Sequence, residues 1–160
     1  MKALSRRGLL LAALSAPLAG RAADALVPAP ASLAAELGAA RGRGRALVVM
    51  FSLPGCPWCR LVRQSYLAPL RAEGQPVVEV ALTGTRAIAG FDGAPTTGAQ
   101  LARALGVRVA PTLLFIGRDG KEVAERLRGV PLPDFYGAYL QQRVEAANRA
   151  AAPAAPYAGA

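Results

Sequence analysis

The sequence predicts an α/β fold in which a mixed four-stranded sheet is flanked by helices on both faces. Residues 46–51 and 77–82 are short apolar runs separated by a helical segment, which predicts a parallel strand pair with a right-handed crossover. Residues 112–116 and 122–127 flank an Asp-Gly dipeptide, a turn signal that predicts an antiparallel hairpin. The expected order of elements is therefore α-β-α-β-α-β-β-α.

Capping residues and helix breakers predict where the helices begin. Ser32 can cap a helix that runs to residue 40, and Thr97 can cap one that runs to residue 105. Pro57 fits the first position of the helix between the parallel strands, and Asp134 can cap the last helix. Residues 83–98 are rich in Gly, Thr and Pro, so we expect a long connection that contributes to partner choice rather than to the core.

Length and composition predict one folded domain. The chain has 160 residues, and we assign the domain to residues 26–149, followed by a flexible Ala- and Pro-rich tail over residues 150–160. A hydrophobic content of 53% with 18% charged residues excludes a disordered polyelectrolyte. The sequence contains no His, which excludes Ser-His-Asp triads and Cys-His nucleophile pairs.

The basic character of the chain does not predict a nucleic-acid partner. Nineteen Lys and Arg against ten Asp and Glu give a net charge of +9. These cations are mostly single Arg residues spread along the chain, without the basic stripe or the sequence module that nucleic-acid binding requires. We therefore expect a solvated basic surface, no nucleic-acid partner and no cofactor.

Residues 1–25 have the pattern of a secretory signal peptide. Basic residues, among them Arg6 and Arg7, precede the uncharged stretch 8–20, which is too short to span a membrane, and small residues follow it. We expect export to the periplasm. The Arg6-Arg7 pair fits a twin-arginine signal and a plain Sec signal alike. The alternative is that the segment forms an amphipathic first helix of the domain.

The motif Cys56-Pro57-Trp58-Cys59 stands where the first strand meets its helix. At the start of the helix, unpaired backbone N–H groups favour an anion, which lowers the pKa of the Cys56 thiol and raises its thiolate fraction. Cys59 lies one turn further on and can close a disulfide with Cys56. Trp58 is expected to flank this disulfide as an exposed apolar contact. The pattern predicts a redox pair.

Three other roles for the two cysteines fit the sequence less well. A structural zinc site needs four ligands, and the chain has no second cysteine pair and no His. A structural disulfide around so short a loop would stabilise the fold little. Two buried core thiols are not expected around a proline in an exported protein. Arg60 and Arg63 follow the cysteines at helical spacing and add positive potential.

Residues 45–144 resemble the thioredoxin superfamily. Residues 51–59 look like its strand, loop and active-site helix, and residues 107–115 look like its V-x-x-x-P-T-x-x-F segment. The resemblance implies a thioredoxin-like fold. It also implies that Pro111 follows a cis peptide bond and faces the cysteine pair, which leaves the backbone of Ala110 free to pair with an extended substrate.

Two positions depart from the family pattern. Thioredoxins carry Gly-Pro between the cysteines, where this chain has Pro57-Trp58. This dipeptide affects the reduction potential, so the family does not set the reduction potential of this chain. The family often has a buried Asp six residues before the first cysteine, and this chain has Met50 there. Glu79 interrupts the apolar second strand and is the candidate to take the Cys59 proton. Its alternative is an exposed position on that strand.

Together these features predict a monomeric periplasmic thiol–disulfide oxidoreductase. Cys56 attacks a disulfide in a protein substrate, and Cys59 resolves the mixed disulfide. The resemblance to exported proteins that receive electrons from a membrane donor favours the reductase direction over the oxidase or isomerase direction. A non-catalytic binding or chaperone-like module that uses the groove around Trp58 and Pro111 is the alternative function.

Overall fold

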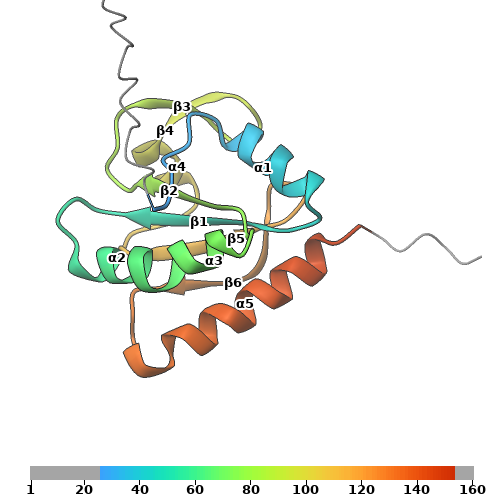
Figure 1. Ribbon diagram of the computed structural model, residues 1–160. Coiled ribbons are helices and arrows are strands. Elements are labelled where there is room, and N and C mark those ends of the chain that lie inside the picture. Colours follow the sequence, from blue (N-terminus) through green and yellow to red (C-terminus); the bar gives the residue numbers. More distant parts are fainter. Residues whose placement is uncertain (1–25, 154–160) are drawn as a thin grey trace, which may run out of the picture.

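The computed structural model describes residues 26–153, so the predicted signal peptide and residues 154–160 lie outside the described part. A four-stranded sheet in the order β2-β1-β5-β6 forms the centre of the molecule (Figure 1). Strands β1 and β2 are parallel, and β5 runs antiparallel to both β1 and β6. This arrangement confirms the predicted mixed sheet. The four strands are β1 (Leu47–Ser52), β2 (Val77–Ala81), β5 (Thr112–Ile116) and β6 (Glu122–Arg128).

Helices cover both faces of this sheet, as predicted. On one face Val48 and Met50 of β1 pack with residues of the active-site helix and of the last helix. On the other face Val49 and Phe51 pack with residues of α1 and α4. All six residues of β1 are buried because the strand lies between these two apolar clusters. The helices are α1 (Leu33–Gly42), α2 (Pro57–Val62), η1 (Arg63–Leu67), α3 (Ala68–Ala72), α4 (Gly98–Ala104), η2 (Pro133–Phe135) and α5 (Tyr136–Ala151).

Two of the predicted helix caps are confirmed and one is wrong. The Ser32 hydroxyl accepts a hydrogen bond from the Ala35 N–H at 3.1 Å, and the Thr97 hydroxyl accepts one from the Gln100 N–H at 3.2 Å. Asp134 does not cap α5. It lies inside the short 3-10 helix η2, which leads into α5 without a side-chain cap.

The carboxyl-terminal helix continues further than the sequence predicts. Helix α5 runs to Ala151, whose side chain is buried in the core, so the start of the predicted tail at residue 150 is helical. No helix in the described range 26–153 is long and apolar enough to cross a membrane.

We predicted that residues 83–98 form a connection that does not contribute to the core, and this prediction is wrong. It contains a two-stranded antiparallel sheet of β3 (Ala87–Ala89) and β4 (Pro95–Thr97). Ile88 is buried with Leu33 and Leu37 of α1. Strands of three residues are too short to show the alternation from which a strand is recognised, so the Gly- and Pro-rich composition concealed them.

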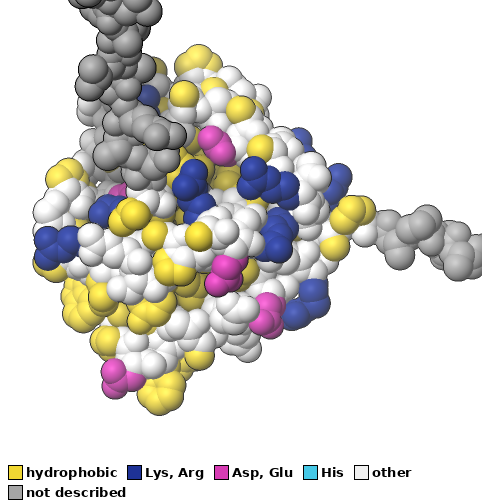
Figure 2. Space-filling model, in the orientation of Figure 1, with side chains coloured by type: hydrophobic (Ala, Val, Ile, Leu, Met, Phe, Trp, Pro, Cys, Tyr) yellow, Lys and Arg dark blue, Asp and Glu magenta, His cyan; other side chains and the backbone are white. Residues whose placement is uncertain are grey.

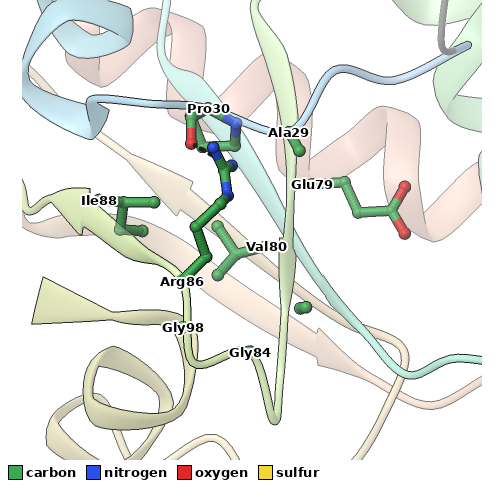
Figure 3. Close-up of a pocket in the computed structure, with 9 residues that line it drawn as sticks. Ala29, Pro30, Glu79, Val80, Gly84, Arg86, Ile88 and Gly98 are labelled. Atoms are coloured by element: carbon green, nitrogen blue, oxygen red, sulfur yellow. Dashed lines mark hydrogen bonds between the residues drawn. The ribbon is translucent and has the colours of Figure 1, made fainter.

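Residues 27–31 form an extended amino-terminal strap along the edge of the fold. The carbonyl of Pro28 accepts a hydrogen bond from the Glu79 N–H of β2 at 2.9 Å, and that of Ala31 accepts one from Ala89 of β3 at 3.0 Å. Val27 is buried in the core. The strap therefore joins the outer edge of β2 to the small sheet. Figure 3 shows the strap residue Pro30 beside Arg86, which donates a hydrogen bond to its carbonyl.

Tyr136 opens α5 and is buried against the active-site helix. Its ring lies 5.1 Å from that of Tyr66 in η1, centroid to centroid. Its hydroxyl is buried and has no hydrogen-bond partner among the described residues. Burial, with a smaller contribution from Tyr66, raises the pKa of Tyr136 above its usual range.

Candidate active site

The two cysteines stand at the start of the helix that follows β1. They form a disulfide, with their Cα atoms 5.3 Å apart. Cys56 is the N-cap of α2, Pro57 is its first residue, and the Cys56 sulfur accepts a hydrogen bond from the Cys59 N–H at 3.1 Å. A backbone donor aimed at this sulfur favours the thiolate once the disulfide is reduced. The local geometry is the one that the sequence predicts.

The two cysteines differ in their exposure to solvent. Cys59 is completely buried, whereas Cys56 is partly exposed at the protein surface. Trp58 between them is 48% exposed. Cys56 is therefore open to an incoming group, whereas Cys59 is shielded from one.

The active-site helix contains a π-helical turn that the sequence analysis missed. Helix α2 continues directly into the π-helix η1, which starts at Arg63, and then into α3. The Ala68 N–H bonds to the carbonyl of Arg63, five residues back. Pro69 follows and has no N–H to donate, so it is the one sequence signal for an irregular helix here.

Arg63 and Glu79 connect this turn to β2. The Arg63 Nε donates to Glu79 Oε2 at 2.6 Å and its Nη2 donates to Oε1 at 2.5 Å. The Ser52 hydroxyl donates to Oε1 as well, at 2.5 Å. The hydrogen bond to Glu79 raises the pKa of Arg63, an effect that burial opposes. Glu79 is therefore a paired carboxylate with three hydrogen bonds.

Glu79 lies next to Met50 in the central sheet. It is the register partner of Met50, the residue at the place of the missing carboxylate. Its side chain is 14% exposed. Figure 3 shows it leaving β2 on the opposite side from Val80, which points into a small pocket under the strap. The side-chain hydrogen bonds of Glu79 within residues 26–153 go to Arg63 and Ser52, and none goes to a cysteine sulfur.

A cavity of about 360 Å³ opens beside Cys56. Glu79 and Cys56 both line it, so the structure brings these two predicted residues together. The cationic side chains of Arg60 and Arg63 line it too. The remaining lining residues are Ser52, Leu53, Pro54, Gly55 and Ala81.

Pro111 precedes β5 and follows a cis peptide bond from Ala110, as expected. Thr112 pairs with Phe51, so Pro111 lies at the same end of the sheet as the loop that carries Cys56. The Pro111 carbonyl accepts a hydrogen bond from Gly129 at 2.7 Å. Ala110 is half-buried, precedes the strand pairing and makes no backbone hydrogen bond within the described residues.

The described part of the chain contains no group of three or more Cys, Asp or Glu side chains that could hold a metal ion.

Residues 33–143 match the family of the thioredoxin-like domain, and this match covers more than half of the chain. The protein therefore belongs to the thioredoxin-like family. Family membership, together with the Cys56–Cys59 pair, supports thiol–disulfide oxidoreductase activity. No curated protein shows significant sequence similarity to the chain.

Solved structures share the fold at low sequence identity. The thioredoxin of Fasciola hepatica superposes with a TM-score of 0.50 at 24% identity, over 74% of this chain and 97% of that chain. The thioredoxin of Thermus thermophilus gives 0.51 at 24% identity, over 74% and 86% of the two chains. A thioredoxin-fold protein from Helicobacter pylori gives 0.52 at 14% identity, over 79% and 78%.

Proposed function

We propose that the protein is a monomeric periplasmic thiol–disulfide oxidoreductase that reduces disulfides in protein substrates. The observation that carries this proposal is the contrast between a partly exposed Cys56, whose sulfur accepts a backbone hydrogen bond, and a fully buried Cys59. One sulfur is presented to the substrate and the other is kept for the second step.

The reaction is two successive thiol–disulfide exchanges. The Cys56 thiolate attacks a substrate disulfide, forms a mixed disulfide and releases the first substrate sulfur, which takes up a proton as a thiol. Cys59 then loses its proton and attacks the Cys56 sulfur, which releases the second substrate thiol. The substrate gains two electrons and two protons, and the protein is left with the Cys56–Cys59 disulfide. A membrane electron donor would restore the dithiol.

Glu79 is proposed as the acceptor of the Cys59 proton. It lines the cavity that contains Cys56, and it neighbours Met50 in the sheet. The carboxylate is held in one orientation by Arg63 and Ser52. An orientated carboxylate at this depth can act as a general base through one water molecule.

Substrate contacts are proposed for Trp58, Ala110 and Pro111. The exposed Trp58 ring offers an apolar surface next to the disulfide. The backbone of Ala110, which is unpaired among residues 26–153, can extend the sheet by hydrogen bonding to an extended substrate segment. Pro111 supports this contact because it has no N–H of its own to pair.

Export rests on residues 1–25, which have a basic beginning, an uncharged core and small residues at their end. Cell fractionation of the wild type and of an Arg6→Lys, Arg7→Lys variant tests the route. A twin-arginine signal predicts that the double variant stays in the cytoplasm, whereas a Sec signal predicts unchanged export. Retention of the wild-type protein in the cytoplasm would contradict the localisation.

Reduction of insulin disulfides in the presence of dithiothreitol tests the activity, with Cys56→Ser as the control. The wild type should accelerate insulin precipitation and the variant should not. The reduction potential against glutathione then decides the direction. A value near about −270 mV identifies a reductase, and a value near about −120 mV identifies an oxidant. Wild-type protein without any effect on insulin would favour a non-catalytic binding module.

A further inference from the structure

We propose that the cavity beside Cys56 binds a carboxylate of the substrate through Arg60, so that the protein prefers disulfides that carry a nearby acidic group. This inference rests on the proposed function, since it names the class of substrate that the same site selects. The argument depends on how the charges that line the cavity are paired.

Arg60 lies one helical turn beyond the nucleophile. Its backbone N–H bonds to the Cys56 carbonyl at 3.1 Å, which fixes the origin of its side chain relative to the reactive sulfur. Its side chain lines the cavity together with Cys56, and the residue is exposed to solvent. A group bound by Arg60 therefore lies beside the sulfur that the substrate must approach.

Three charged side chains line the cavity, and two of them neutralise each other. Arg63 and Glu79 form a two-point ion pair, and Ser52 occupies a further acceptor position of the carboxylate. Arg60 has no salt bridge or side-chain hydrogen bond within residues 26–153. The cavity therefore carries one uncompensated positive charge and favours an anion over a cation.

The cavity has room for the anion. About 360 Å³ lies within the range for small-molecule sites and is more than the side chain of one acidic residue needs. A guanidinium presents parallel N–H donors that match a carboxylate. We therefore assign the subsite to an Asp or Glu close to the substrate cysteine.

Three small disulfides of matched length and different charge provide the test. 3,3′-Dithiodipropionate is anionic, 2-hydroxyethyl disulfide is neutral and cystamine is cationic. The reduced full-length protein is mixed with each, and the fluorescence of Trp58, the only tryptophan of the chain, reports oxidation of the neighbouring cysteines. The readout is the ratio of the anionic to the neutral rate constant, because any effect of Arg60 on the Cys56 thiolate cancels in this ratio.

We expect the wild-type ratio to be about five or more at low salt and to decrease in high salt. Arg60→Gln should bring the ratio to about one, Arg60→Lys should keep part of it, and cystamine should show the opposite trend. Arg149→Gln, an exposed arginine in the last turn of α5, is the matched control and should leave the ratio unchanged.

Two results would overturn the inference. A wild-type ratio of one or less excludes an anion subsite, and an equal loss in the Arg60 and Arg149 variants shows that only net charge matters. If the protein reduces none of the three disulfides, the proposed function fails instead. In that event, NMR shifts of residues 54–60 in the oxidised protein decide the subsite. They should move with 3,3′-thiodipropionate and not with neutral thiodiglycol, and no movement would exclude anion binding.

Discussion

Arg63 and Glu79 hold the active-site helix to the edge strand β2 through two hydrogen bonds of 2.6 and 2.5 Å. The π-helical turn begins at Arg63, so the irregular part of the helix is also the part that contacts the sheet carboxylate. This pair links the elements that carry the two halves of the proposed chemistry: the cysteines on α2 and the proton acceptor on β2.

Cys56 should be the nucleophile, with a thiol pKa below the value of about 8.5 for a free cysteine, because the Cys59 N–H stabilises its thiolate. Labelling of the reduced protein with iodoacetamide across a pH series, followed by peptide mapping, measures this. Cys56 should react first and at lower pH than a free thiol, and Cys59 should react slowly. Faster labelling of Cys59 would reverse the assigned roles.

Replacement of Glu79 by Gln should slow turnover by about 100-fold or more if the carboxylate accepts the Cys59 proton, and the pH profile should lose one limb. Gln keeps one oxygen for Ser52 and the Arg63 Nη2 but loses the acceptor of the Arg63 Nε–H, so a purely structural role predicts a slower rate with both limbs of the pH profile kept. Insulin reduction over a range of pH separates the two roles. Circular dichroism of the variant should match that of the wild type.

Ile88→Ala should lower the free energy of unfolding by about 2 kcal/mol, because it removes a buried side chain from the cluster shared with α1. Urea denaturation of the oxidised protein measures the loss. Thr85→Ala, at an exposed position before the same strand, is the control and should change the stability by less than about 0.5 kcal/mol. Equal stabilities for the Ile88 variant and the wild type would show that β3 lies outside the cooperative core.

Tyr136→Phe should leave the protein as stable or more stable at pH 7, because it removes a buried hydroxyl without a partner among the described residues. The raised pKa of Tyr136 means that the folded state keeps a proton that the unfolded state loses above about pH 10. The contribution of Tyr136 to the free energy of unfolding is therefore fully present below pH 10 and decreases above it. Urea denaturation at pH 7 and pH 10.5 should show a smaller decline for the variant, and an equal decline would refute the burial effect.

The sequence predicted the parts of the fold that carry strong local signals. Two apolar runs predicted β1 and β2, the Asp-Gly turn signal predicted the hairpin of β5 and β6, and Ser32 and Thr97 predicted two helix starts. Asp134 was misassigned because its residue type fits a cap, yet the chain makes a 3-10 turn there after Pro133. Capping propensity cannot distinguish an α-helix start from a 3-10 turn, since an acidic residue lies near the first turn of both.

The site was predictable where one segment determines it, and less so where distant segments meet. Cys56 and Cys59 follow from their position at a helix start. That Glu79 neighbours β1 followed from its strand. Its pairing with Arg63 joins side chains of two different elements that are 16 residues apart in the sequence, and no local pattern of either element indicates it.

The amino-terminal strap also changes how the sheet edge behaves toward other molecules. Strand β2 ends the central sheet, and an exposed edge is a template on which another chain can add a strand. At the outer edge of β2, the Pro28 carbonyl accepts the hydrogen bond of the Glu79 N–H. Pro30 has no N–H, so it cannot donate a hydrogen bond to a further strand. The strap thus closes the edge of the molecule nearest the proposed proton acceptor against self-association. A chain shortened beyond Val27 would lose core packing and become prone to aggregate through the same strand.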